Sequence, residues 1–260
     1  MSFLKKLVWR LVPSPMLLWA KKQYYAYVVP RFCEADVEPI KCFIRPGDSV
    51  IDLGANIGWY TAVLSKLVGE RGKVYAVEPI PGTFTLLLSV IKKLRLTNVV
   101  PFNCAVSDSN GSAVMEIPKH EYGGENYYMA RIVSGKSSDP SQGKFEVPLR
   151  SLDSLLPGQL SEGVTFVKCD VEGHELAVLK GASHFFEKVK PAMLIEVTGT
   201  AKMQDAPDNE FYSIMSAYGY VPYWFDGEHL RKRMKGQWSV NYFFLQATHL
   251  PQVAHLIVDL

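Results

Sequence analysis

The sequence has few cysteines: among its 260 residues only Cys33, Cys42, Cys104 and Cys169 occur. They form no C-x-x-C pair and have no histidine beside them at metal-ligand spacing, so we expect reduced thiols and predict no metal site from this pattern. The chain also lacks a large excess of either charge: 28 Lys and Arg stand against 26 Asp and Glu, which gives a formal net charge of +2. This balance argues against nonspecific nucleic-acid binding and favours a small molecule or a local surface as the partner.

The chain lacks an apolar run of the roughly 18 residues that span a bilayer. The one candidate, near the N-terminus, is interrupted by Arg10, Pro13, Pro15, Lys21 and Lys22. We therefore predict a protein that is not transmembrane and is cytoplasmic. A composition of 48% hydrophobic residues supports a core of ordinary globular size, and about 150 residues per domain predicts one large domain, or one domain with an appendage.

Residues 1–43 are interpreted as an N-terminal segment that precedes a main domain at 44–260. The first 30 residues combine lysine and arginine with leucine, tryptophan and tyrosine. Three interpretations stay open: a cap packed on the main domain, a helix on an anionic membrane surface, or a poor signal peptide. Pro13 and Pro15 would break a long amphipathic helix, and no clean cleavage site follows, so the cap is favoured.

From residue 47 onward, short apolar β-branched runs alternate with amphipathic stretches of helix length. This alternation predicts an α/β fold with a doubly wound parallel sheet. We expect strands at 49–53, 73–78, 99–104, 164–169 and 192–197, and helices at 58–67, 81–94, 175–182 and near 209–218. Two later apolar runs, 220–225 and 241–246, are separated by a basic stretch and predict a closing antiparallel pair.

An insertion of about residues 108–156 separates the third and fourth core strands. Its turn-rich pieces, SDSNG, EYGGEN and SGKSSDPSQGK, predict a β-hairpin with a mobile loop. Ligands of open α/β sheets bind beyond the carboxyl ends of the strands, so this excursion is placed to cover a substrate as a lid. A passive surface loop is the alternative.

A glycine loop, DLGANIG at 52–58, ends the first strand and opens a helix. Gly54 and Gly58 allow a tight turn and close approach of a ligand, and the helix N-terminus supplies amide donors. Glu78 closes the second strand, where an acceptor can bridge the two hydroxyls of a ribose. Together these features suggest an adenosine ligand, although the glycines alone are equally compatible with a simple strand-to-helix turn.

A nicotinamide dinucleotide is the first rival ligand. Its G-x-G-x-x-G pattern would need glycine where Asn56 stands, whereas Asp52-x-Gly54-x-x-x-Gly58 is the arrangement associated with S-adenosylmethionine. An acid before the turn suits a ligand with an ammonium group and no pyrophosphate, so Asp52 is a candidate cofactor residue, directly or through water.

Six motifs in order carry a family resemblance: DLGANIGWYT, VYAVEP, NCAVSD, VPLRSLDSLL, FVKCDVEGHELAVLKGA and PAMLIEV. Over about residues 44–198 the chain resembles the FkbM-type methyltransferases, a branch of the class I S-adenosylmethionine-dependent enzymes. The resemblance implies a Rossmann-like, mostly parallel seven-stranded sheet with an antiparallel C-terminal strand, and O-methylation of hydroxyls on sugars, glycolipids or secondary metabolites. The N-terminal segment and the C-terminal pair are not well covered, so the acceptor is not carried over.

The resemblance also implies residue roles. Gly54, Asn56 and Gly58 would line the methionine part of the cofactor, and Glu78 would hold the ribose. Ala105 and the residues after it follow the third strand, where this fold class meets the adenine. Asp108 is a candidate adenine contact, but it also fits an ordinary Asp-Ser-Asn-Gly turn.

The candidate catalytic residues are Asp170, Glu172 and His174, at the end of the fourth strand and the start of a helix. Methyl transfer to a hydroxyl needs an in-line geometry and a group that takes up the hydroxyl proton. The family motif supports Asp170, also a candidate cofactor residue, and Glu172, while His174 occupies a variable position. Alternatively, acidic side chains in the first turn of a helix stabilise it by interacting with the helix dipole and need have no catalytic role. Asp170 and Glu196 form an acidic rim, with a divalent cation as the less favoured alternative.

These features predict an S-adenosylmethionine-dependent O-methyltransferase acting on a hydroxyl of a sugar, glycolipid or secondary metabolite. No nucleic-acid partner is expected, and residues 1–30 are the candidate for peripheral membrane contact. A noncatalytic adenosyl-ligand module is the alternative from another class, followed by an NAD-dependent oxidoreductase. Measured cofactor turnover and cofactor preference would separate the three.

Overall fold

The computed structural model describes residues 14–117, 131–132, 143–156, 163–197, 209–234 and 236–258. The middle of the insertion, on which the lid interpretation depends, lies outside the described residues. The same holds for residues 1–13, the first part of the segment considered for membrane contact.

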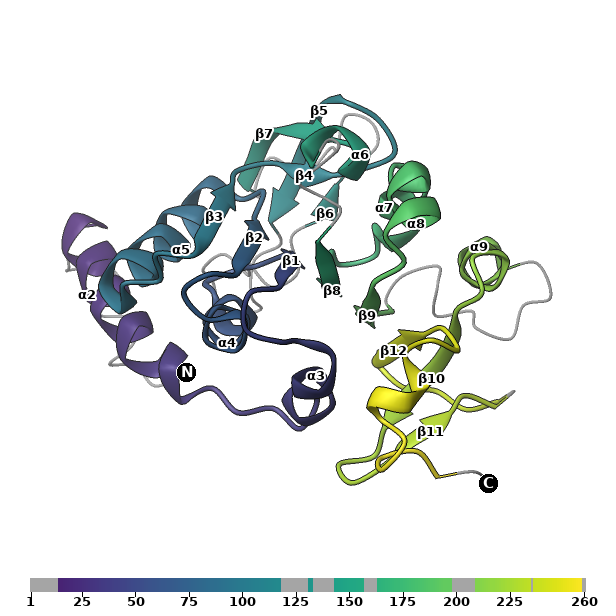
Figure 1. Cartoon of the computed structure of the whole chain (residues 1–260). Helices are drawn as coiled ribbons and strands as arrows, with labels where there is room; N and C mark the ends of the chain where they lie inside the picture. Colours follow the sequence, from purple (N-terminus) through teal and green to yellow (C-terminus); the bar gives the residue numbers. More distant parts are fainter. Residues whose placement is uncertain are drawn as a thin grey trace.

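A central eight-stranded sheet organises the chain (Figure 1), in the order β11-β10-β12-β9-β8-β1-β2-β3. Strands β3, β2, β1, β8 and β9 run parallel, and β12, β10 and β11 are added in antiparallel pairs. Their bounds are β1 Ser49–Leu53, β2 Lys73–Val77, β3 Val99–Phe102, β8 Val164–Cys169, β9 Ala192–Glu196, β10 Val221–Phe225, β11 Leu230–Lys232 and β12 Asn241–Leu245. The mostly parallel sheet with an antiparallel C-terminal strand confirms the predicted fold class.

The eighth strand, β11, exceeds the seven strands that were expected. It lies in the basic stretch between the last two apolar runs, where the composition suggests only a connection. Asp226 accepts hydrogen bonds from the amides of Glu228 (2.9 Å) and His229 (2.6 Å) and pairs with Arg231 at 2.6 Å. These contacts reverse the chain, so that Leu230–Lys232 returns beside β10 as an edge strand.

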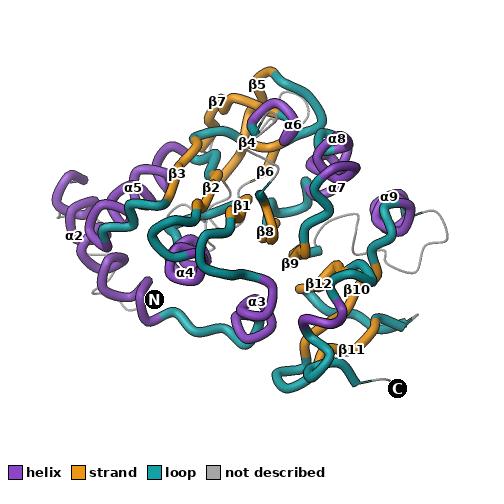
Figure 2. The backbone as a smooth tube through the Cα atoms, viewed as in Figure 1, coloured by secondary structure: helices purple, strands orange, loops and turns teal. Residues whose placement is uncertain are grey.

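Helices cover both faces of the sheet (Figure 2), as a doubly wound fold requires. In β1, Val50 packs on one side and Ile51 on the other, because successive side chains of a strand alternate. The Val50 side is covered by α3 (Val37–Phe43), α4 (Trp59–Val68) and α5 (Pro81–Leu94). The Ile51 side is covered by α7 (Glu175–Lys180), α8 (Ser183–Lys188) and α9 (Glu210–Ala217).

The helix predicted at 175–182 is wrong in its extent, because α7 ends at Lys180 and α8 starts at Ser183. The break falls at Gly181. A Cβ atom there would lie 1.9 Å from the carbonyl oxygen of Ser107. The backbone after the third strand thus presses on the end of α7.

The described part of the insertion forms a second sheet in the order β4-β7-β5-β6. Strands β5 and β7 pair antiparallel from Gly111↔Leu149 to Ile117↔Gly143, which confirms the predicted hairpin-like pairing. The bounds are β4 Ala105–Val106, β5 Gly111–Ile117, β6 Arg131–Ile132 and β7 Gly143–Arg150, followed by α6 Leu152–Leu155. Met115 and Ile132 of this sheet face the ends of the main strands and line a cleft described below.

The described part of the N-terminal segment packs on the main domain. Helix α2 (Ser14–Val28) leads through the 3-10 turn η1 (Val29–Arg31) to α3, whose Ile40 and Phe43 are buried in the core. Pro15 falls in the first turn of α2, where a missing amide hydrogen is tolerated. A last 3-10 turn, η5 (Leu250–Gln252), follows the C-terminal strand. Among the described residues, no helix combines the length and apolar character that crossing a membrane requires.

Candidate active site

The glycine loop after β1 brings the ends of three strands together. The amides of Gly54 and Ala55 both donate to the carbonyl of Val77 at 2.9 Å, which ties the loop to β2. Gly54 has φ +78°, and a Cβ atom built on it would lie 1.7 Å from the carbonyl oxygen of Asp170, beyond β8. Only glycine fits this close approach, so Gly54 decides how near the ends of β1 and β8 come.

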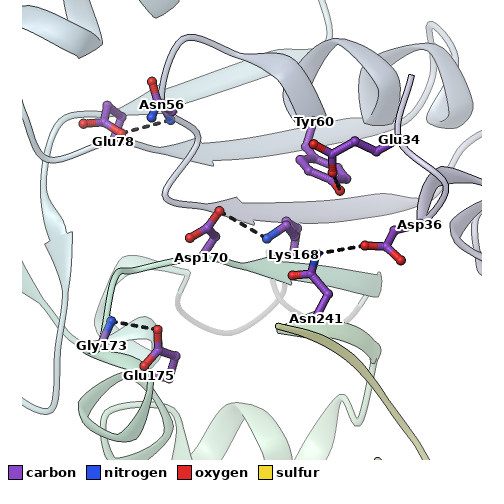
Figure 3. Close-up of polar contacts among 10 residues, drawn as sticks. All are labelled: Glu34, Asp36, Asn56, Tyr60, Glu78, Lys168, Asp170, Gly173, Glu175 and Asn241. Carbon is purple, nitrogen blue, oxygen red and sulfur yellow. Dashed lines mark hydrogen bonds and ion pairs between the residues drawn. The ribbon is translucent and has the colours of Figure 1, made fainter. Parts of the chain in front are cut away.

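Glu78 fixes the other side of this loop. One of its carboxylate oxygens accepts a hydrogen bond from the amide of Asn56 at 2.9 Å (Figure 3). The other accepts from the amide of Ile80, also at 2.9 Å. Burial raises the pKa of Glu78 to about 7, although the two amide hydrogen bonds lower it. Asn56 adopts φ +49°, a strained conformation for a residue other than glycine. The carboxylate and the strained loop together form the floor of a cleft.

This cleft, the cofactor cleft, lies beyond the carboxyl ends of β1, β2 and β8 and is open to solvent. Apolar side chains make most of its wall, with one buried carboxylate at Glu78. Such a lining suits a nucleoside, because apolar groups can hold a base and a carboxylate can accept from ribose hydroxyls. The lining residues are Leu53, Gly54, Asn56, Val77, Glu78, Pro79, Ile80, Cys104, Ala105, Val106, Met115, Ile132, Asp170, Val171, Glu172 and His174.

Two predicted cofactor residues lie elsewhere. Asp52 is buried on the α4 side of β1, where its Oδ2 accepts from the Thr61 hydroxyl at 2.5 Å, and burial raises its pKa to about 6. Gly58 adopts φ +97° at the start of α4, and a Cβ there would contact Leu87 Cδ1 at 3.0 Å. Gly58 therefore allows α4 to begin against α5, and it is not among the described residues that line the cofactor cleft.

Of the residues that follow the third strand, some line the cofactor cleft and others do not. Ala105 lines the cleft, and its contact with an adenine stays a prediction. Asp108 is exposed, and its Oδ1 accepts from the Ser109 hydroxyl at 2.9 Å. Ser107 is buried, and its hydroxyl hydrogen-bonds His174 Nε2 at 2.9 Å.

The predicted catalytic run has two different environments. His174 is partly buried at the cofactor cleft, where burial lowers its pKa and Ser107 holds its ring. Glu172, with φ +52°, lies exposed at the rim; partial burial and the neighbouring Asp170 raise its pKa to about 7. Glu175 is buried and accepts from the amide of Gly173 at 2.9 Å, so it satisfies the turn before α7 (Figure 3).

A second cavity, the acidic cavity, lies on the α4 side of the same strand ends and is open to solvent. It shares Gly54, Asn56 and Asp170 with the cofactor cleft, so the two spaces meet at these residues. Carboxylates and aromatic rings dominate its lining. The lining residues are Phe32, Glu34, Asp52, Gly54, Ala55, Asn56, Trp59, Tyr60, Lys168, Asp170, Glu196 and Asn241.

Lys168 is the one basic residue among those lining residues. Its side chain is only 2% exposed; Nζ lies 3.4 Å from Asp170 Oδ2 and 5.1 Å from the centre of the Tyr60 ring (Figure 3). Burial lowers the pKa of Lys168, but the carboxylates of Asp170, Glu196 and Asp52 outweigh this and raise it above its usual value. The sequence interpretation missed Lys168, although a lysine inside the apolar strand VTFVKC signals a buried cation with acidic partners.

Glu196, at the end of β9, faces Asp170. Burial raises the pKa of Glu196 to about 7, with the Asp170 charge and a hydrogen bond to the Asp170 side chain adding to the effect. The raised pKa favours the protonated form of Glu196. Within the described ranges, no three His, Cys, Asp or Glu side chains converge in an arrangement that would hold a metal ion.

The N-terminal segment contributes to the acidic cavity, which the sequence interpretation did not foresee. Glu34 accepts from the Tyr60 hydroxyl at 2.6 Å, and Asp36 accepts from Asn241 Nδ2 at 2.8 Å (Figure 3). The Oδ1 atom of Asn241 is buried with no hydrogen-bond partner among the described residues. The loop before α3 and strand β12 thus close one wall of the cavity, in a region that carries no sequence motif.

Comparison with known proteins gives a consistent set of similarities. The sequence model of the methyltransferase FkbM domain matches residues 52–222. The hexuronic acid methyltransferase AglP of Haloferax volcanii is 29% identical over 142 residues, 55% of this chain and 53% of that protein. A protein-L-isoaspartate O-methyltransferase of Methanocella arvoryzae is 39% identical over 59 residues, 23% of this chain and 31% of that protein. The aligned region thus spans about half, or less, of the length of these curated relatives.

Among solved structures, the methyltransferase FkbM from Methylobacillus flagellatus KT aligns with a TM-score of 0.51 at 17% identity, covering 88% of this chain and 58% of that one. This likeness concerns the fold. The mostly parallel sheet, the glycine loop and the acid at the end of β2 fit the class that the FkbM domain match indicates, the S-adenosylmethionine-dependent methyltransferases. Because the domain match extends over more than half of the chain, the chain belongs to the methyltransferase FkbM domain family.

Proposed function

We propose that this protein transfers a methyl group from S-adenosylmethionine to a hydroxyl of a sugar or a related polyhydroxyl acceptor. The observation that carries the proposal is the meeting of two unlike cavities at Gly54, Asn56 and Asp170. One is mainly apolar with a single buried carboxylate, and the other is polar and acidic. A two-substrate transfer requires this arrangement, with both substrates reaching one point of contact.

The cofactor cleft fits S-adenosylmethionine by the chemistry of its lining. Glu78 would hold the ribose hydroxyls, and Ala105 and Val106 would contact the adenine. Asp52 and Asp170, on the acidic side, would favour the cofactor's positive charge. When bound, the cofactor supplies an electrophilic methyl group on a sulfonium.

Asp170 is the proposed proton acceptor for the hydroxyl. The acceptor oxygen would take the methyl group as the S–CH3 bond of the cofactor breaks, S-adenosylhomocysteine would leave, and the hydroxyl proton would pass to the carboxylate of Asp170, beside Glu196. Lys168 holds Asp170 at the junction of the two cavities through the 3.4 Å ion pair. Glu172 and His174 are kept as residues that orient the substrates at the rim, since one is exposed and the other is bound to Ser107.

The charge of the acidic cavity supports a neutral or cationic acceptor. Four of its lining residues carry carboxyl groups, and Lys168 is the one basic residue beside them. An anionic acceptor would meet like charges at short range, which disfavours binding. The hexuronic acid named for the Haloferax volcanii relative is an anion, so we propose that this chain prefers a hydroxyl on an uncharged sugar or an amino sugar.

The first experiment is calorimetric titration of the purified chain with S-adenosylmethionine and S-adenosylhomocysteine, with NAD as control. Saturable binding of the first two ligands alone supports the proposed cofactor; preferential NAD binding would revive the oxidoreductase alternative.

The second experiment measures S-adenosylhomocysteine release with methyl glycosides of glucose, glucosamine and glucuronic acid as acceptors. The acceptor assignment is supported if the neutral or amino sugar gives S-adenosylhomocysteine release and if this release is slower in Asp170→Asn. Release with the uronic acid alone refutes the charge argument, and cofactor binding without turnover on any acceptor favours the noncatalytic module.

A further inference from the structure

Helix α2 exposes aromatic and apolar side chains along one face. Met16, Trp19, Tyr24 and Tyr27 are 61%, 63%, 60% and 62% exposed. At about 100° per residue, these four positions fall within an arc of roughly 140° on the helix. These four side chains, the aromatic stripe of α2, therefore lie on one side of the helix. Gln23 falls within the same arc, and its Oε1 accepts from Lys93 Nζ of α5 at 2.6 Å, so one polar contact with the protein interrupts the stripe.

The opposite face of α2 packs on the protein. Leu18, Lys21 and Tyr25 line a pocket with the first turn of α5 and with Asn56 of the glycine loop. Figures 1 and 2 both show α2 alongside α5 at one edge of the molecule. A surface helix of a globular protein ordinarily turns its polar face to water. In α2 this arrangement is reversed, because the aromatic stripe points away from the protein.

The charges around the stripe favour an anionic partner. Lys21 and Lys22 stand about 60° beyond its two edges, one on each side. No acidic residue precedes Glu34, whereas six basic residues do: Lys5, Lys6, Arg10, Lys21, Lys22 and Arg31. A second copy of the chain seated on this face in a symmetric dimer would bring like charges together, so self-association is disfavoured.

We propose that the aromatic stripe of α2 docks the protein on the surface of an anionic phospholipid bilayer. Tryptophan and tyrosine concentrate at the boundary between headgroups and hydrocarbon, and a flanking lysine such as Lys22 reaches lipid phosphates. Asn56 lines the pocket beneath α2 and also both cavities of the candidate active site. Docking through α2 holds the methyl-transfer site close to the membrane surface, within reach of acceptors carried by lipids.

The test is co-sedimentation of the full chain with phosphatidylcholine vesicles containing roughly one-third phosphatidylglycerol, compared with pure phosphatidylcholine. We expect binding to the anionic vesicles that weakens with added salt. The double variant Trp19→Ser/Tyr27→Ser should lower the partition coefficient at least about tenfold. The control Trp238→Ser removes a tryptophan that is 59% exposed in the C-terminal region and should bind like the parent chain.

Three results would overturn the proposal. These are absence of vesicle binding by the intact chain, equal binding by the double variant, and a dimer in sedimentation equilibrium that the double variant converts to monomer. Calorimetry with S-adenosylhomocysteine accompanies each variant. Unchanged affinity establishes that the fold is intact, and failure of the docking proposal leaves the proposed function untouched.

Discussion

Replacing Gly54 with alanine tests whether the close approach of β1 and β8 builds the site. The new Cβ would lie 1.7 Å from the Asp170 carbonyl oxygen, and real contacts of this kind stay beyond 3.0 Å, so the two strand ends must separate by about 1.3 Å. A positive φ in a residue other than glycine costs about 1–2 kcal/mol, and overpacking typically adds about 1–3 kcal/mol. We therefore expect the free energy of unfolding to fall by about 2–5 kcal/mol.

The matched control is Gly227→Ala. Gly227 has φ +100°, but a Cβ there meets nothing within 4 Å, so only the backbone term of about 1–2 kcal/mol applies. Urea denaturation measures both variants, and calorimetry with S-adenosylhomocysteine measures the site. Gly54→Ala should weaken ligand binding at least about tenfold, because Asp170 moves with its carbonyl, while Gly227→Ala should leave it unchanged. If the two variants lose equal stability and bind equally, the close approach does not shape the site.

Three further predictions concern single side chains. In the parent chain we expect the affinity for S-adenosylhomocysteine to rise with pH as Glu78 ionises near pH 7, since ribose hydroxyls donate best to a carboxylate. Glu78→Gln should weaken this binding about 10-fold or more and abolish its pH dependence. If calorimetry shows the same pH profile for parent and variant, Glu78 is not part of the site. Asp170→Asn should lower turnover about 10²–10⁴-fold with a smaller effect on cofactor affinity, and comparable losses in both would assign Asp170 to cofactor binding instead. The pKa of Glu196 is raised from 4.5 to about 7 in the folded chain, so the stability that its bound proton contributes is fully present below about pH 4 and is lost as the pH rises through 7. Allowing for its partial exposure, Glu196→Gln should remove about 1–2 kcal/mol of this loss in denaturation curves between pH 5 and 8, and parallel pH curves for parent and variant would contradict the assignment.

Much of the fold follows from local patterns. The strands at 49–53 and 164–169 are mostly apolar runs, interrupted by Asp52 and Lys168, and burial on both faces of a parallel sheet selects such sequences. Gly54 and Glu78 could be named because a turn and an acid at fixed places after neighbouring parallel strands must meet at one edge. The end of the helix at Lys180 could not be foreseen, because Gly181 is held by contact with Ser107, distant in sequence.

The sequence by itself determined the fold class, the family and the half of the site that lies in motifs, since those depend on periodicity and short spacings within the chain. Only the tertiary structure decided the acidic cavity, where Glu34, Lys168 and Asn241 meet from the N-terminal segment, β8 and β12. It also placed Gly58 and Asp108 outside the described lining of the cofactor cleft. Such placements depend on packing between segments far apart in the chain, and that packing sets the charge of the acidic cavity.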